Sequence, residues 1–210
     1  MNFLIIDDHS MIRAGMNILI SKEYPSAQFY EAANEKQACR FLGEKAFDLI
    51  IMDLNMPESD PVRLLQFIKT NQPKTPVLVL TMNEEKSFAG RFFKMGIKGY
   101  VNKSADNPVI LEAIRVVLQN GMYMSQELKD SLLNSFVTQR TDNPFEALSD
   151  REFQVIRELL RGKSIAEIAE DQGINISTVS TYKGKACEKL GVKRNNFVEL
   201  LSLAKTNGII

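Results

Sequence analysis

Short apolar runs alternate with longer amphipathic segments over about the first 120 residues of the chain. The apolar runs lie at residues 3–6, 28–30, 47–52, 77–80 and 100–101. Continuous runs of this length are typical of strands buried on both faces of a parallel sheet. The segments between them carry apolar side chains at three- and four-residue spacings, which predicts helices at residues 11–21, 35–43, 62–71, 84–95 and 108–120. Five such units predict an α/β domain over residues 1–122, with a doubly wound, five-stranded parallel sheet.

The strand pattern stops after Gly121, and the rest of the chain is polar or helical. Residues 123–144 are mostly polar with a weak helical stripe, and we interpret them as a linker that contains a short helix. Residues 145–210 show four helical segments separated by short turns, which predicts an all-α domain. The helix starts are predicted at Ser149, Ser164, Ser177 and either Asn195 or Asn196.

Composition narrows the function only a little. Lys plus Arg and Asp plus Glu both total 26, so the bulk charge indicates no particular partner. The two cysteines fall in different predicted domains and offer no disulfide framework, which favours a reducing compartment. The chain begins with a strand-like run, and no stretch approaches the roughly 20 apolar residues that span a bilayer. We therefore expect a soluble, cytoplasmic protein that does not engage a membrane.

Polar side chains follow the predicted strands at the points where the strands end. Asp7 and Asp8 follow the first strand, and Asp53 ends the third. Thr81 ends the fourth, and Lys103 follows the fifth. Because the carboxyl ends of parallel strands meet at one edge of the sheet, we expect these five side chains to lie together. Converging carboxylates repel one another and predict a hard cation such as Mg²⁺. A carboxylate beside a metal, a lysine and a hydroxyl is suited to accept a phosphoryl group.

These residues resemble the receiver domain of two-component response regulators, across about residues 1–120. The runs that carry the resemblance, besides the strand-end residues, are Ile-Ile-Met-Asp-Leu-Asn-Met-Pro at 50–57 and Gly-Tyr-Val-Asn-Lys at 99–103. The resemblance implies a flavodoxin-like strand order and a phosphoryl group transferred from a histidine kinase to Asp53, supported by Thr81 and Lys103. Thr81 and Tyr100 would form a switch, although an aromatic residue in a strand is often simply part of the core.

The same resemblance implies a Mg²⁺ site. Its ligands would be Asp7 or Asp8, together with Asp53 and the backbone carbonyl of Asn55, and Asp8 matches the usual principal ligand. The lone histidine, His9, is expected to serve the loop rather than catalysis. Met82 stands where the family usually has a small residue, so we expect it to crowd the path to Asp53 and to slow the gain or loss of phosphate.

The loop before the third predicted helix departs from the family pattern. The family commonly has glycine near position 61, where this chain has Ser-Asp-Pro at 59–61, and a proline can still open a helix.

In the second domain, helices at 164–172 and 177–190 joined by a glycine-containing turn predict a helix-turn-helix, whose second helix can enter a major groove. From Ser177 onward only Glu188 and Glu199 oppose the cations Lys183, Lys185, Lys189, Lys193, Arg194 and Lys205. This local surplus favours contacts with the phosphates of double-stranded DNA.

Residues 145–205 resemble the DNA-binding domain of the NarL/LuxR (FixJ) type, in Leu-Ser-Asp-Arg-Glu at 148–152 and Leu-Gly-Val at 190–192. By family position, the residues that face bases are Ser180, Thr181 and Gly184, and those near the DNA backbone are Thr178, Tyr182, Lys183 and Lys185. Gly184 costs about 1 kcal/mol of helix propensity relative to alanine, and it either permits close approach to DNA or only weakens the helix. The fourth helix would offer a dimerisation face.

Three functions are consistent with these patterns. The leading hypothesis is a transcription regulator, not an enzyme, in which phosphorylation of Asp53 promotes a homodimer that binds paired DNA half-sites. A phosphatase of the haloacid-dehalogenase type uses a similar strand-end aspartate, but it needs a second acid where this chain has Asn55. A constitutive DNA-binding protein with the receiver as a dimerisation module is the third hypothesis, and the intact acidic pocket disfavours it.

Overall fold

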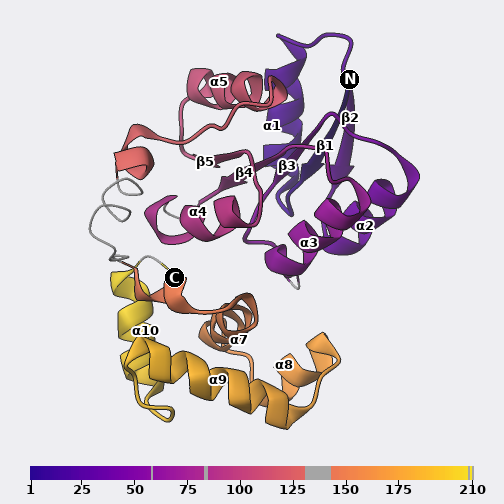
Figure 1. Ribbon diagram of the computed structural model, residues 1–210. Helices are drawn as coiled ribbons and strands as arrows, with labels where there is room; N and C mark the ends of the chain where they lie inside the picture. The colour runs from indigo at the N-terminus through magenta and orange to yellow at the C-terminus, as the bar shows by residue number, and fades with distance from the viewer. Residues whose placement is uncertain (58, 83–84, 131–142, 208, 210) are drawn as a thin grey trace. The chain divides into compact units, whose positions relative to one another are not determined.

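The computed structural model describes residues 1–57, 59–82, 85–130, 143–207 and 209. The chain forms two compact units, Met1–Ser131 and Leu132–Ile210, and each is considered by itself (Figure 1). Among the described residues, none of the helices combines the length and the apolar character that a membrane crossing requires.

The first unit is built on a parallel sheet of five strands, in the order β2-β1-β3-β4-β5. The strands are β1 (Asn2–Ile6), β2 (Gln28–Ala32), β3 (Leu49–Met52), β4 (Val77–Thr81) and β5 (Gly99–Asn102). The helices that alternate with them are α1 (Ser10–Ser21), α2 (Glu35–Glu44), α3 (Pro61–Asn71), α4 (Glu85–Lys94) and α5 (Asn107–Leu118). This confirms the predicted doubly wound α/β domain and its flavodoxin-like strand order.

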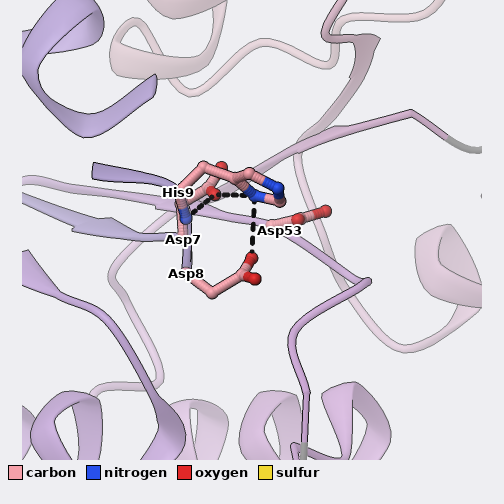
Figure 2. A group of neighbouring side chains, drawn as sticks. All are labelled: Asp7, Asp8, His9 and Asp53. Atoms are coloured by element: carbon pink, nitrogen blue, oxygen red, sulfur yellow. Dashed lines mark hydrogen bonds and ion pairs between the residues drawn. The ribbon is translucent and has the colours of Figure 1, made fainter. Parts of the chain in front are cut away.

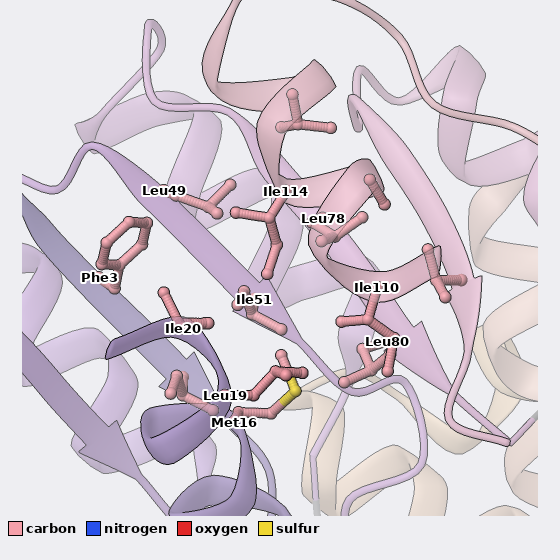
Figure 3. Packing of buried hydrophobic residues seen from close by; sticks show 14 residues of the cluster. Phe3, Met16, Leu19, Ile20, Leu49, Ile51, Leu78, Leu80, Ile110 and Ile114 are labelled. Atoms are coloured by element: carbon pink, nitrogen blue, oxygen red, sulfur yellow. The ribbon is translucent and has the colours of Figure 1, made fainter. Parts of the chain in front are cut away.

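Helices cover both faces of the sheet, which is why its central strands are apolar without alternation. All the residues of β3 and β4 are buried, whereas the edge strand β2 is only partly buried. One face packs against α1 and α5 (Figure 3). The labelled members of that core are Phe3, Leu49, Ile51, Leu78 and Leu80 from the strands and Met16, Leu19, Ile20, Ile110 and Ile114 from the helices. Because both faces of the central strands are buried, β3 and β4 present polar side chains only where they end.

The chain that follows α5 returns to the outer edge of β5. Tyr123 donates its backbone N–H to the Lys98 carbonyl at 2.9 Å and accepts from the Tyr100 N–H at 3.3 Å. Gly99 lies between them, and a Cβ there would stand 2.6 Å from Leu78 Cδ1 and 3.4 Å from Tyr123 Cβ. The glycine is therefore required by the close approach of the Leu78 side chain, whereas the distance to Tyr123 is an ordinary van der Waals contact.

The predicted linker, residues 123–144, falls partly within the described residues. Residues 126–130 are helical, and Leu128 is buried. The remainder of the weak helical stripe, Leu132, Leu133 and Phe136, lies outside the described residues.

The second unit is helical throughout its described residues, as predicted. A short 3₁₀ helix, η1 (Pro144–Ala147), precedes α7 (Asp150–Leu160), α8 (Ile165–Gln172), α9 (Ile176–Leu190) and α10 (Phe197–Thr206). Ser149 and Ser164 form capping boxes with the glutamates three residues later. Helices α8 and α9 end at Gly173 and Gly191, whose φ angles of 62° and 69° suit glycine.

The predicted start of α9, Ser177, was wrong. Helix α9 begins at Ile176 with Asn175 as its N-cap, so Ser177 lies inside the first turn. Asparagine and serine are equally good N-caps, and the pattern alone could not choose between two candidates two residues apart. For α10 the structure selects Asn196, whose side chain accepts from the Glu199 N–H.

Candidate functional site

The parallel register of the sheet brings the predicted polar residues to one edge. Asp7 follows β1, Asp53 follows β3, Thr81 is the last residue of β4, and Lys103 follows β5. The backbone ladder continues past the strands, because the Asp53 N–H donates to the Ile6 carbonyl and the Lys103 N–H donates to the Thr81 carbonyl, both at 2.9 Å. The positions of these side chains are therefore fixed by the sheet itself rather than by flexible loops.

A buried lysine joins two buried carboxylates at the centre of the site. Lys103 Nζ lies 2.7 Å from Asp53 Oδ2 and 2.6 Å from Asp7 Oδ2, and the three side chains are between 2% and 5% exposed. Burial alone lowers the pKa of Lys103, but the hydrogen bonds and charges of Asp53 and Asp7 outweigh it and raise the pKa above its ordinary value. Lys103 is thus a fixed cation at neutral pH, held against both acids.

Asp8 and His9 complete the acidic edge of the site (Figure 2). His9 donates its backbone N–H to Asp7 Oδ1 at 2.9 Å, and its ring Nδ1 lies 3.2 Å from the same oxygen and 2.9 Å from Asp8 Oδ1. One ligand atom each from Asp7, Asp8, His9 and Asp53 lies within 4.8 Å of the others. The sequence prediction gave His9 no part in this site, and its position directly after two acids was the signal available.

The donor set fits a hard cation and a phosphoryl group. Among the described residues, two buried oxygens at the site have no hydrogen-bond partner, namely Asp8 Oδ1 and Thr81 Oγ1. For Asp8 Oδ1 this holds although His9 Nδ1 is near, because proximity alone does not give a well-directed hydrogen bond. Buried oxygens are normally satisfied, so these two point to a ligand, and carboxylate oxygens are what Mg²⁺ prefers. The site is therefore an acidic cluster in which two buried oxygens can still bind a cation or a phosphoryl group.

Three further predicted residues surround Asp53 and Thr81. The Asn55 N–H donates to Asp53 Oδ1 at 3.1 Å, and its carbonyl as a Mg²⁺ ligand stays a prediction. Tyr100 is 1% exposed, so its ring occupies the buried position of the predicted switch. Met82 is 63% exposed, and its effect on phosphate also stays a prediction.

The predicted DNA-contacting residues all lie on α9. Ser180, Thr181 and Lys185 are exposed, whereas Thr178, Tyr182 and Lys183 are half-buried. The Thr181 hydroxyl donates to the Ser177 carbonyl at 2.9 Å, so its hydrogen is committed within the helix while its oxygen can still accept. The individual DNA contacts stay predictions.

Gly184 differs from the other predicted base-facing residues because it is buried. A Cβ at this position would lie 2.6 Å from Cζ and 2.7 Å from Nη2 of Arg194. The glycine is therefore covered by a guanidinium, and it does not present an open backbone. Sequence reasoning counted Arg194 only as part of a general charge surplus.

Two ion-pair groups lie in the second unit, one between helices and one at the end of α7. Lys189 Nζ of α9 lies 2.6 Å from the buried Glu152 of α7. Glu158 pairs with Lys163 at 2.9 Å and with Arg161 at 3.1 Å. Burial alone raises the pKa of Glu158, but the Lys163 hydrogen bond and the neighbouring arginines outweigh it and lower the pKa. Lys189 is thus engaged in helix packing, which reduces the surplus of cations on α9.

Comparisons with known proteins agree with both halves of this description. Residues 3–115 match the family described as the response regulator receiver domain, and residues 146–204 match the bacterial regulatory proteins of the luxR family. The oxygen regulatory protein NreC of Staphylococcus aureus is 31% identical over 200 residues, which cover 92% of each chain.

Solved structures of RcsB are also similar. RcsB from Salmonella enterica serovar Typhimurium, bound to the promoter rprA in the presence of the phosphomimetic BeF₃⁻, has a TM-score of 0.76 and 26% identity, covering 98% of this chain and 99% of RcsB. A structure of two RcsB dimers bound to two parallel DNAs has a TM-score of 0.71 and 26% identity, covering 97% of both chains. The chain belongs to the response regulators that join a receiver domain to a LuxR-type DNA-binding domain.

Proposed function

We propose that this chain controls transcription through transfer of a phosphoryl group from a histidine kinase to Asp53, and that it is a regulator rather than an enzyme. The observation that carries the proposal is the pairing of Asp53 Oδ2 with Lys103 at 2.7 Å, beside the unpartnered hydroxyl of Thr81. A buried nucleophile, a fixed cation and a free hydroxyl are the groups that phosphoryl transfer requires.

The residues of the site divide the work of the transfer. An Asp53 carboxylate oxygen forms the bond to phosphorus while the bond between phosphorus and the donor breaks, and the donor leaves with its electron pair. Lys103, already beside Asp53, offsets the negative charge on the phosphoryl oxygens. The Thr81 hydroxyl, which has no hydrogen-bond partner in the described part of the chain, would donate a hydrogen bond to one of those oxygens. Asp7 and Asp8, with Asp53 and the Asn55 carbonyl, would hold Mg²⁺, which supplies further charge neutralisation when bound.

Phosphorylation would then bias two states of the receiver. Thr81 ends β4 and Tyr100 lies in the neighbouring β5, so a movement of Thr81 towards a phosphoryl group changes the packing beside the buried ring. A ligand shifts such an equilibrium only as far as it binds one state better, and Thr81 makes its new bond in the phosphorylated state alone.

We propose a homodimer on paired half-sites of double-stranded DNA as the active form, acting in the cytoplasm. The exposed Ser180, Thr181 and Lys185 of α9 support a recognition helix in the major groove. RcsB, which is similar over both domains, has been solved with promoter DNA and as dimers on DNA.

The experiment is to incubate the chain with Mg²⁺ and acetyl phosphate or beryllofluoride, and to follow its mass and its oligomeric state. Asp53→Asn should abolish both the added mass and the monomer-to-dimer shift. Asp48→Asn is the matched control, because Asp48 is exposed and precedes the same strand at its opposite end. Equal labelling of Asp53→Asn and wild type would refute the assignment.

Two other outcomes would favour the competing functions. Steady turnover of a phosphate ester would identify a phosphatase. Normal DNA binding that does not respond to the phosphodonor would identify a constitutive DNA-binding protein.

A further inference from the structure

Helix α9 lacks a side chain at one position of its exposed stripe, and Arg194 occupies the space. Ser180, Thr181 and Gly184 lie three and four residues apart and therefore share one side of the helix. Ser180 and Thr181 are exposed, but Gly184 is buried. The guanidinium of Arg194 is responsible, since a Cβ on Gly184 would meet three of its atoms at 2.6–2.9 Å.

The turn after α9 directs Arg194 back along the helix. Gly191 adopts a φ of 69°, and the Val192 N–H donates to the Cys187 carbonyl at 2.9 Å, which reverses the chain. The Asn196 N–H donates to the Lys193 carbonyl at 2.9 Å, so Arg194 is a central residue of a second turn. Two consecutive hydrogen-bonded turns thus fix the backbone from which the guanidinium reaches Gly184.

Arg194 is an available cation on this stripe. Within the described residues it has no acidic partner, whereas Lys189 of the same surplus is 2.6 Å from Glu152. Three guanidinium atoms of Arg194 occupy the space of a Gly184 Cβ, so this side chain lies against the helix. Guanidinium donors match the oxygens of a phosphate. Arg194 as a residue is exposed, so a ligand can reach it from solvent.

We infer that Arg194 binds a DNA backbone phosphate as part of the recognition surface of α9, and that Gly184 is its positioning residue. The missing side chain at 184 lets the guanidinium lie against Gly184, on the side of the helix that also carries Ser180 and Thr181. The inference rests on the proposed DNA binding. The sequence analysis placed Gly184 among the residues that face bases, whereas this inference gives it the role of positioning Arg194 for a phosphate.

The size of the effect follows from counterion release. Each neutralised phosphate contributes about 0.9 to the slope of log affinity against log salt, which at about 0.15 M salt corresponds to roughly fivefold in affinity. Arg194→Gln should therefore lower the affinity about fivefold on every duplex and reduce the slope by about 0.9. Gly184→Ala should weaken binding in the same direction, because the new methyl group displaces the guanidinium.

The experiment measures binding of the full chain to a fluorescein-labelled duplex of random sequence, by anisotropy from about 50 to about 200 mM NaCl. The variants are Arg194→Gln, Gly184→Ala and the two combined. Lys205→Gln removes an exposed cation from α10 as the charge control. Gly15→Ala is the control for helix propensity, because a Cβ there has no neighbour within 4 Å.

A positioning role predicts that Gly184→Ala has no effect once Arg194 is Gln, while Gly184→Ala alone unfolds at no lower temperature than wild type. Equal losses from Gly184→Ala in both backgrounds would show that the glycine acts on its own and would overturn this role. The phosphate contact of Arg194 would be overturned if Arg194→Gln left the DNA affinity unchanged, or if Lys205→Gln lowered it by the same factor. The measurement is repeated on a duplex of A·T pairs only, and a loss that is absent there would assign Arg194 to a guanine edge and overturn the phosphate contact. A wild-type chain that binds no duplex would instead refute the proposed DNA binding, and this inference with it.

Discussion

Replacing Lys103 by glutamine should destabilise the receiver unit strongly. Lys103 Nζ lies within 2.7 Å of carboxylate oxygens on both Asp7 and Asp53. Glutamine keeps a similar length but leaves two nearly buried anions facing each other without a cation. Removing one partner from a buried ion pair typically costs about 3–5 kcal/mol. Asp8 is 26% exposed beside this site, and solvent there softens the repulsion, so we expect about 3 kcal/mol, the low end of that range.

The assay is urea unfolding of the full chain in EDTA, with hydrogen exchange of peptides from β1 and β3 to assign the loss to the receiver. With a typical slope of about 2 kcal/mol per M, the midpoint of the receiver transition should fall by about 1.5 M. Added Mg²⁺ should raise the midpoint more for Lys103→Gln than for wild type, because the variant site has lost its resident cation. Lys74→Gln, an exposed lysine, is the control and should stay within about 0.5 kcal/mol.

The pH dependence provides a second check on the same reasoning. The folded chain raises the pKa of Lys103, so its stabilisation is complete below the ordinary lysine pKa and is lost only as the pH rises through the raised value. The difference in urea midpoint between wild type and Lys103→Gln should therefore be the same at about pH 6 and at about pH 9. Equal midpoints for the two proteins in EDTA would refute the reasoning. Adding Asp53→Asn to the variant should recover part of the loss, since it removes one of the two anions.

Four other predictions concern separate parts of the chain. Ser149→Ala removes the hydroxyl of a capping box and should cost the second unit about 1 kcal/mol, and an unchanged melting temperature would contradict it. Glu158→Gln should lower the urea midpoint at pH 7 by the equivalent of about 1–2 kcal/mol, because three cations lose their anion. The folded chain lowers the pKa of Glu158, so this difference should shrink as the pH falls below the usual value of 4.5, and a constant difference would argue against it. A thiol reagent should modify the half-buried Cys39 before Cys187, because burial raises the pKa of both thiols but Cys187 is only 1% exposed; mass spectrometry of timed samples would show the order, and simultaneous modification would contradict it. Met82→Ala should speed both the gain and the loss of phosphate, and identical decay of the phosphorylated proteins would disprove the crowding.

Much of the site could be predicted because it depends on topology alone. Once the apolar runs are strands of one parallel sheet, Asp53, Thr81 and Lys103 must reach the same edge, whatever the loops do. The starts of α7 and α8 could also be predicted from the sequence, since Ser149 and Ser164 each stand three residues before a glutamate.

The contacts that could not be predicted join segments through turns. Arg194 reaches Gly184 only because the chain reverses at Gly191, and no spacing in the sequence encodes where an arginine head comes to rest. Lys189 of α9 and Glu152 of α7 pair although they lie 37 residues apart in the chain. Periodicity locates a face on an element, but it does not say which side chain of another element lies opposite.

The attachment of Tyr123 to β5 links the phosphorylation site to the connection between the two units through one short strand. The same strand that leads into Lys103 is hydrogen-bonded, through Lys98 and Tyr100, to the chain on its way to the second unit. Tyr100 and Lys103 are three residues apart, or about 10 Å of extended strand. We therefore expect a shift of Lys103 to reach the connection through the backbone of this strand and its hydrogen bonds to Tyr123, without passing through side chains of the core.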